Sequence, residues 1–195
     1  MATLGFFHHV YDNLDATEFA IKNVREHYPD SFYMLIGDGG VNHYELAKKY
    51  NCHYYHNADN LGYGESTLEE LLEELKRVLI ACIKTNTTHL MMVEDDVWLR
   101  NTLSVRDEWE MACHDIRVGN IIPEPVIDMI ERFAGKRPLT NQYGGGGGSI
   151  FKVSTFLTNY TRVTNWFKSN TDYIRENFYT ELGFMDCYMV VYYML

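Results

Sequence analysis

The sequence predicts a single α/β domain in which helices flank a mainly parallel central sheet. Three observations support this fold class. Short apolar runs alternate with amphipathic segments in the order β-α-β-α-β-α-β. Residues 89–93, HLMMV, are apolar without interruption, which is typical of a strand buried on both faces of a parallel sheet. The chain has 195 residues, a length that suits one domain.

The first predicted strand covers residues 4–10, and a helix and a second strand follow it. Asp15 and Glu18 form a capping pattern that opens the helix. Pro29 ends it, because proline cannot continue a helix. Residues 31–36, SFYMLI, have the apolar and aromatic content of a strand, and the GDGG that follows is typical of a turn.

A short helix over residues 43–50 leads to the third predicted strand at 53–56, HYYH. The next helix has the clearest pattern, since Ser66 and Glu69 form a capping box at its start. Apolar side chains then recur at helical spacing until the fourth strand at 89–93. These side chains are Leu68, Leu71, Leu72, Leu75, Val78, Leu79 and Cys82.

Beyond the fourth strand, the pattern predicts a helix over residues 102–116, a shorter one within 121–140 and a strand at 149–153, SIFKV. Five glycines, 144–148, precede that strand. Only 47 residues follow the glycines, too few to bury a separate core easily, so we expect the run to lie within the domain. Glycine-rich backbone beside a strand lets a ligand approach closely or offers amide donors. A mobile loop without a ligand role is the alternative interpretation.

The composition limits the classes of function. With 17 Lys and Arg against 27 Asp and Glu, the net charge of −10 argues against non-specific nucleic-acid binding, and an anionic substrate would need a metal counter-ion. The four cysteines lie far apart, which favours reduced thiols and a cytoplasmic location. We expect neither a signal peptide nor a membrane span. The apolar ending VVYYML indicates either a helix packed to its end or a fragment of a longer protein.

Polar or glycine-rich segments follow each of the first four predicted strands, and sheets of this class bind ligands at the carboxyl ends of their strands. After the fourth strand come three adjacent carboxylates, Glu94, Asp95 and Asp96. In an extended segment, Glu94 and Asp96 project to one side. Such hard oxygen ligands suit Mn²⁺ or Mg²⁺ held together with substrate phosphates. A solvated loop without a metal is the alternative.

An acidic D-x-D-type triplet at the end of a strand, in a chain with this order of elements, resembles the GT-A glycosyltransferases. In that family the triplet binds the divalent ion that bridges the donor's diphosphate. Residues 9–13, HVYDN, resemble the loop that meets the base, with Tyr11 as the stacking ring. Residues 37–40 resemble the acidic turn that hydrogen-bonds the base, and 60–64, NLGYG, the segment beside the ribose and diphosphate. The resemblance implies a nucleotide-sugar site made of His9, Tyr11, Asp12, Asp38, Asn60, Gly62, Gly64 and Asp95.

The triplet departs from the family pattern at its first position, which is Glu instead of Asp. The resemblance therefore assigns the Mn²⁺ or Mg²⁺ first to Asp96. Glu94 would be a second metal ligand, or would contact the ribose or a bound water instead.

Inverting members of the family use one Asp or Glu near the start of a late helix as the general base. Asp186 opens an apolar helical stretch, where a helix N-terminus would keep the carboxylate ionised, and Glu181 is the reserve candidate. A plain N-cap is the alternative role for Asp186. The resemblance also places Gly145, Gly146 and Gly147 where the acceptor and the donor's sugar meet.

The resemblance implies a metal-dependent transferase that moves a sugar from a nucleotide-sugar, with UDP favoured, to a glycan or protein-linked acceptor with inversion. Residues 1–100 would form the nucleotide-binding half of one domain, and 101–195 the acceptor-side half. The layout is family-2-like and is similar to domains that large algal viruses encode to glycosylate their capsid protein, which would place it in the host cytoplasm. A sugar nucleotidyltransferase of related fold and a non-catalytic nucleotide- or glycan-binding module are the alternatives.

Overall fold

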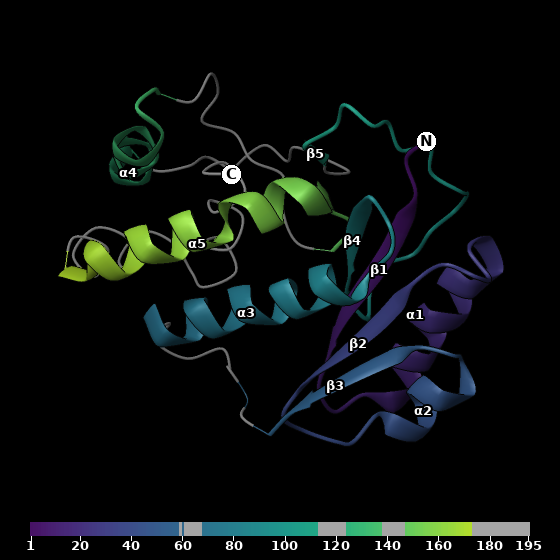
Figure 1. Ribbon diagram of the computed structural model, residues 1–195. Helices are drawn as coiled ribbons and strands as arrows, with labels where there is room; N and C mark the ends of the chain where they lie inside the picture. Colours follow the sequence, from purple (N-terminus) through teal and green to yellow (C-terminus); the bar gives the residue numbers. More distant parts are fainter. Residues whose placement is uncertain (59, 61–67, 113–123, 138–146, 173–195) are drawn as a thin grey trace.

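The structure is a computed structural model that describes residues 1–58, 60, 68–112, 124–137 and 147–172 (Figure 1). Strands and helices alternate as predicted as far as the fourth strand. In chain order the elements are β1 (Leu4–Val10), α1 (Leu14–His27), β2 (Tyr33–Asp38), α2 (Tyr44–Lys49), β3 (His53–Asn57), α3 (Leu68–Lys84), β4 (His89–Val93), β5 (Met111–Ala112), α4 (Glu124–Ala134), β6 (Ile150–Lys152) and α5 (Val153–Ser169).

The strands of the described residues form one sheet in the order β3-β2-β1-β4-β6-β5. β1 is parallel to β2 and β4, and β2 is parallel to β3, whereas β6 is antiparallel to β4 and β5. The predicted fold class, a mainly parallel α/β sheet, is confirmed. The strand order reverses between β1 and β4, and sheets of this kind bind ligands beside such a reversal, at the carboxyl ends of the strands.

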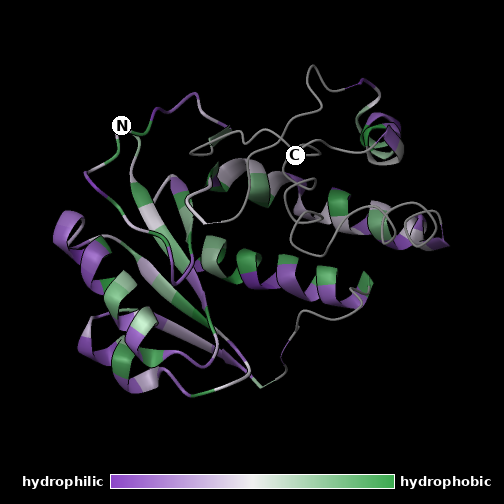
Figure 2. Ribbon diagram, turned by 180° about the vertical axis from the view of Figure 1, so that it is seen from behind, coloured by the Kyte–Doolittle hydropathy of each residue, from purple (hydrophilic) through white to green (hydrophobic). Residues whose placement is uncertain are grey.

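Helices cover both faces of the sheet (Figure 1). The core under α1 and α2 includes Phe6 and Val93, and the core under α3 and α5 includes Phe7 and Met92. Figure 2 shows hydrophilic and hydrophobic residues in alternating bands along the helices, as expected for helices with one buried side. Because successive side chains of a strand point to opposite faces, sequence neighbours such as Phe6 and Phe7 enter different cores.

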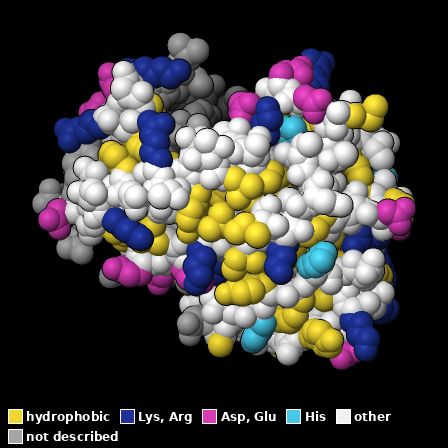
Figure 3. Space-filling view, in the orientation of Figure 1, with side chains coloured by type: hydrophobic (Ala, Val, Ile, Leu, Met, Phe, Trp, Pro, Cys, Tyr) yellow, Lys and Arg dark blue, Asp and Glu magenta, His cyan; other side chains and the backbone are white. Residues whose placement is uncertain are grey.

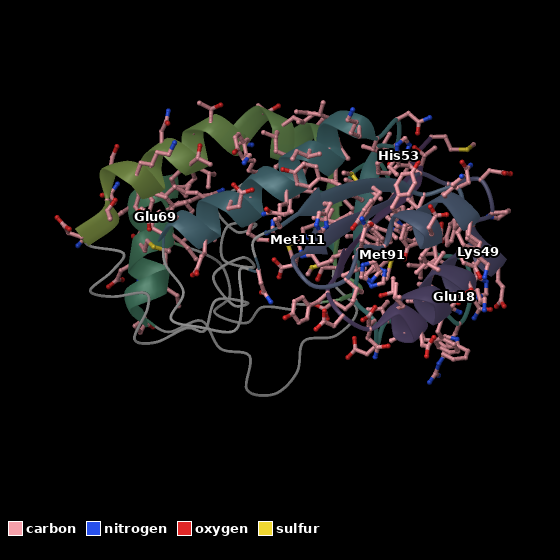
Figure 4. All side chains as sticks on the ribbon, turned by 90° about the horizontal axis from the view of Figure 1, so that it is seen from below. Glu18, Lys49, His53, Glu69, Met91 and Met111 are labelled. Atoms are coloured by element: carbon pink, nitrogen blue, oxygen red, sulfur yellow. The ribbon has the colours of Figure 1, made fainter. Side chains whose placement is uncertain are left out.

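The start of α1 differs from the predicted capping pattern. Asn13 is the N-cap, and its side-chain oxygen accepts a hydrogen bond of 3.0 Å from the backbone N–H of Ala16. Asp15 lies in the first turn, where a negative charge is favourable. Glu18 accepts a hydrogen bond of 2.7 Å from Lys49 of α2, so it ties the two helices together (Figure 4).

The predicted helix over residues 102–116 is wrong in the part that the structure describes. Residues 102–110 are not helical, and Met111–Ala112 form β5, which pairs with β6. Backbone groups of this segment bond to distant residues: the Trp109 carbonyl accepts from His89, and the Glu110 carbonyl accepts from the backbone of Lys152. These long-range bonds replace the local ones that a helix would need.

The strand expected at 149–153 is confirmed as β6, which is shorter than predicted because α5 begins at Val153. α5 is rich in Thr, Val and aromatic residues, a composition that favours strands, so its sequence gave little sign of a helix. Its buried residues Val153, Phe156, Val163 and Phe167 nevertheless recur at helical spacing. Packing of this stripe in the core beside α3 decides the element.

The surface seen in Figure 3 carries a band of hydrophobic side chains across its middle, over α3, with Lys and Arg side chains beside it. Ile83, near the end of α3, is 64% exposed. Among the described helices, none combines the length and the apolar character that a membrane crossing requires.

Candidate functional site

The loops that follow β1, β2 and β3 meet at the carboxyl edge of the sheet. Gly40 has a φ of +62°, and a Cβ placed there would lie 2.5 Å from the Asp12 carboxylate and from the Tyr11 carbonyl. The Val41 N–H donates to that same carbonyl at 3.1 Å. A Cβ on Gly39 would lie 3.1 Å from Asn60. Only glycine permits this packing, which brings Tyr11, Asp12 and Asn60 together around the turn that begins with Asp38.

Tyr11 presents an exposed ring at this edge, with 46% of the residue accessible. The loop position and the exposed aromatic face fit the stacking role expected of Tyr11. Asp38, at the end of β2, accepts a hydrogen bond of 2.7 Å from the Arg77 guanidinium of α3. The carboxylate is thereby fixed in place while about a quarter of its side chain, 26%, stays accessible.

Arg77 belongs to a chain of charges buried between α3 and the sheet. Its Nη1 lies 3.9 Å from Glu74 Oε2, and Glu74 Oε1 lies 3.2 Å from His9 Nδ1. Burial raises the pKa of Glu74, while the neighbouring His9 imidazole and Arg77 guanidinium oppose that rise. This row of polar contacts links Asp38 on β2 to His9 on β1 through Arg77 and Glu74, which belong to no motif in the sequence.

Glu74 and Arg77 stand out in the sequence itself. They occupy the apolar stripe of α3, between Leu71 and Val78, at positions where the helical spacing calls for hydrophobic residues. A charged residue in such a stripe has to be paired when it is buried, and its pairing partners mark a polar site inside the fold.

The acidic triplet divides between the two faces of the sheet. Asp95 turns toward α1, where its Oδ1 accepts from Thr17 Oγ1 and from His8 Nε2, each at 3.0 Å. His8 in turn has its Nδ1 3.1 Å from the hydroxyl of Tyr33, which is buried. Burial of Asp95 acts to raise its pKa, but the hydrogen bonds from His8 and Thr17 prevail and hold the pKa below its ordinary value.

Glu94 lies on the opposite face, toward α3. It is half-buried and accepts a hydrogen bond from the Gly147 backbone, and a Cβ on Gly147 would lie 3.0 Å from its Oε2. Burial raises the pKa of Glu94, the Gly147 N–H opposes the rise, and the charge of Asp96 adds to it. Gly147, from the run of five glycines, therefore touches the first acid of the triplet.

Asp96 is exposed and completes the triplet on the outside. No cluster of three or more His, Cys, Asp or Glu side chains that could hold a metal ion is found within the described residues. One buried oxygen of Glu94, Oε1, has no hydrogen-bond partner among these residues. A cation shared with substrate phosphates needs only one or two carboxylates from the protein, so Glu94 and Asp96 fit such a metal.

Six predicted site residues lie outside the described residues: Asp186, Glu181, Gly62, Gly64, Gly145 and Gly146. The others gather at one edge of the sheet. Tyr11, Asp12, Asp38 and Asn60 lie on the β1, β2 and β3 side, and Glu94, Asp96 and Gly147 lie on the β4 and β6 side. His9 lies between the two groups, on β1.

The buried His8 makes the stability of the fold depend on pH. Burial lowers the pKa of His8 from its ordinary 6.5, although Asp95 acts in the other direction. Below pH 6.5 the unfolded chain therefore takes up a proton that the folded protein does not. We expect the free energy of unfolding to decrease as the pH is lowered below 6.5. Urea titrations at several pH values measure the slope.

In a His8→Asn variant the same slope should be shallower. A residual slope is expected from His43, whose pKa is also lowered by burial. Equal slopes for the variant and the unchanged protein would contradict this prediction.

The sequence matches no protein-family model and no curated protein. The fold of this chain does resemble those of solved structures. The galactosyltransferase LgtC, in complex with donor and acceptor sugar analogs, aligns with a TM-score of 0.58 and 13% identity over 97% of this chain and 70% of LgtC. An active-site mutant of LgtC aligns with a TM-score of 0.53 and 14% identity, over 97% of this chain and 69% of that one. The chain therefore has a GT-A-like fold, as the sequence resemblance implied.

Proposed function

We propose that this protein is a glycosyltransferase that moves a sugar from a UDP-sugar to a glycan or protein-linked acceptor. The observation that carries the proposal is the meeting of three loops and an acidic triplet at the reversal of the strand order. A nucleotide needs a stacking ring and a fixed hydrogen-bond acceptor, which Tyr11 and Asp38 provide. A diphosphate needs a counter-charge, which the triplet can hold as a cation.

Each of these residues contacts a different part of the donor. Tyr11 stacks on the base, and Asp38, held by Arg77, accepts a hydrogen bond from it. Asp12 and Asn60, with Gly62 and Gly64, contact the ribose and the diphosphate. Asp95 acts as a positioning residue: its bonds to His8 and Thr17 fix the backbone from which Glu94 and Asp96 project.

Asp96 would hold Mn²⁺ or Mg²⁺ together with oxygens of the diphosphate, and Glu94 would be either a second ligand or a contact for a hydroxyl group of the donor. The ion would neutralise the charge that builds up on the leaving diphosphate and would orient it. Because Glu94 is half-buried, its carboxylate is less solvated than an exposed one, which strengthens its electrostatic interactions. Asp186 is proposed as the general base that takes the proton of the acceptor hydroxyl, with Glu181 as the reserve candidate and inversion as the outcome.

Calorimetric titration of UDP tests the donor site and the metal together. Binding should tighten about tenfold or more when Mn²⁺ is present, because the ion offsets the repulsion between diphosphate and triplet. Asp96→Asn should lose that gain, whereas Asp107→Asn, at a 63% exposed side chain paired with the N-terminus, should keep it. Equal affinity with and without Mn²⁺ would refute the metal role. Absence of any UDP binding would refute the assignment of a UDP-sugar as the donor.

A screen of nucleotide-sugars for hydrolysis or transfer, run with the same proteins, separates an enzyme from a binding module. Asp186→Ala should bind UDP normally and lose transfer. Transfer at the unchanged rate would overturn the assignment of the base, and UDP binding without any transfer by the unchanged protein would favour a non-catalytic module.

A further inference from the structure

Among the described residues, the buried polar atoms without a hydrogen-bond partner include three at strand ends on the α3 face of the sheet. They are Nε2 of His9, Oε1 of Glu94 and Oγ of Ser149. Buried polar atoms in native proteins nearly always have a partner, so an orphan of this kind requires an explanation. Three of them close together indicate a site for a polar ligand.

The strand register places the three residues beside one another. His8 pairs with Val93, so His9 and Glu94 are neighbours one step further along β1 and β4. The backbone N–H of Met92 donates to the Ser149 carbonyl at 2.9 Å, so Ser149 lies beside Met92, one step below Glu94 on the same face. Three neighbouring segments of the sheet, namely β1, the end of β4 and the residue before β6, therefore each present one orphaned atom toward α3.

Each of these residues is held by its other atoms. His9 Nδ1 is engaged by Glu74 of α3 at 3.2 Å, and the Glu94 carboxylate receives the N–H of Gly147. The side chain of Ser149 is short and its residue only 3% exposed. The orphaned atoms cannot turn out to bulk water without breaking these contacts, so the site is built in advance of its ligand.

The chemistry of the three atoms fits a hydroxyl-bearing group. A carboxylate oxygen accepts, an imidazole nitrogen donates or accepts according to its proton, and a serine hydroxyl does both. A sugar hydroxyl can also donate and accept, and so it satisfies the set whichever nitrogen of His9 carries the proton. An anionic group fits poorly, because Glu74 and Glu94 place two carboxylates at the site.

The position along the sheet edge distinguishes between the two sugars of a nucleotide-sugar. Tyr11, Asp38 and Asn60 occupy the β2 and β3 side, where the proposed function places the base and the ribose. The orphaned atoms lie on β1, at the end of β4 and just before β6, which is the part of the edge away from β2 and β3. A donor lying along this edge would reach them with the sugar beyond its diphosphate.

We propose that His9, Glu94 and Ser149 bind hydroxyl groups of the donor's transferred sugar and that Glu74 is a positioning residue that orients His9 for this contact. The inference rests on the proposed function and deepens it, because it assigns selection of the sugar to one set of residues. Ser149 is a specificity-determining residue at the floor of the site, which no sequence motif indicated.

The test compares UDP with a panel of UDP-hexoses, measured by calorimetry with Mn²⁺ on the unchanged protein and on Ser149→Ala. Ser149→Ala should weaken binding of the preferred UDP-hexose about tenfold and leave UDP within about twofold, since UDP lacks the transferred sugar. The free variant should melt no lower than the unchanged protein, because removal of an orphaned hydroxyl costs the empty site nothing. Ser154→Ala, at an exposed position of α5, serves as the matched control and should change neither affinity.

A second variant keeps the proposal falsifiable if Ser149→Ala folds poorly. His9→Asn should show the same selective loss for the UDP-hexose, and Glu74→Gln should reproduce part of it by raising KM more than it lowers kcat. Equal weakening of UDP and UDP-hexose would move the contact to the ribose and overturn the proposal. If the variants melt at a lower temperature but bind the UDP-hexose with unchanged affinity, the replaced side chains stabilise the fold instead of binding the sugar, and the proposal is also overturned.

The same data separate this inference from the proposed function. If the unchanged protein binds UDP and UDP-hexoses but the variants show no selective loss, the sugar contact alone is wrong. If the unchanged protein binds neither compound, the proposed function fails and this inference falls with it. Loss of Mn²⁺ affinity in Ser149→Ala in the absence of nucleotide would show a cation site and overturn the sugar assignment.

Discussion

Replacing Arg77 by methionine should lower the free energy of unfolding by about 3–5 kcal/mol, the cost of removing one partner from a buried ion pair. Arg77 is 1% exposed and pairs with Asp38 at 2.7 Å and with Glu74 at 3.9 Å. Without the guanidinium, Glu74 remains in the core, and within the part of the chain that the structure describes His9 is the ion-pair partner left beside its carboxylate. Urea unfolding followed by circular dichroism measures the difference.

The exposed pair of Arg106 and Glu108 provides the control. Its N–O distance is also 3.9 Å, but its side chains are 68% and 70% exposed. Arg106→Met should therefore change the free energy of unfolding by no more than about 1 kcal/mol, the usual range for a surface ion pair. If both substitutions lower the free energy of unfolding by a similar amount, burial does not strengthen the contribution of the Arg77 ion pair.

Arg77→Met should also weaken UDP binding, beyond its effect on stability. The arginine helps to fix the Asp38 carboxylate that we assign to the base, and a carboxylate that lacks this hydrogen bond has more motion to lose when the ligand binds. Adding Glu74→Gln to Arg77→Met should restore part of the stability by removing the unpaired charge, yet it should not restore UDP affinity. Recovery of both properties together would contradict the role of Asp38.

Replacing Gly147 by alanine should reduce sugar transfer on the order of a hundredfold, the loss that a displacement of about 1 Å produces in an active site. A Cβ on Gly147 would lie 2.3 Å from Val97 Cγ2 and 3.0 Å from Glu94 Oε2. The first distance is too short for a real Cβ contact and the second is tight, so Val97, Glu94 or the glycine backbone has to shift. Steady-state kinetics with the UDP-sugar found by the screen measure the loss, and UDP affinity should change much less.

Removal of the clashing methyl group gives an internal control. The double variant Gly147→Ala with Val97→Ala no longer contains Val97 Cγ2, the closest atom, and should recover much of the lost activity. Val97→Ala alone should have a small effect, since Val97 is only half-buried. If the double variant is as inactive as Gly147→Ala, the steric explanation is wrong.

The candidate site shows how far the residues alone predict a function. The types of residue that follow each strand were readable, because a polar or acidic segment after an apolar run is a local pattern. Tyr11, Asp38 and Glu94 were selected in this way, and the structure brings their loops to one edge of the sheet. The partners of these residues were not readable, since Arg77 lies 39 positions from Asp38 along the chain.

The acidic triplet illustrates the limit most clearly. The sequence predicted correctly that three carboxylates follow a buried strand, but their separate environments depend on which helix covers each face. Asp95 faces α1 with His8 and Thr17, whereas Glu94 faces α3 and Gly147. One step along a strand reverses the face, and no local pattern says what lies on the other side.

The sequence by itself determined the α/β class, the alternation of strands and helices as far as the fourth strand, and the types of residue that follow each strand. Hydrophobic periodicity and turn residues are local properties, so they can be read from the sequence. Tertiary structure alone decided that residues 102–112 are not a helix, that α5 follows β6 directly, and that Glu74 and Arg77 are buried. These outcomes depend on hydrogen bonds and packing between segments far apart in the chain, which propensity cannot express.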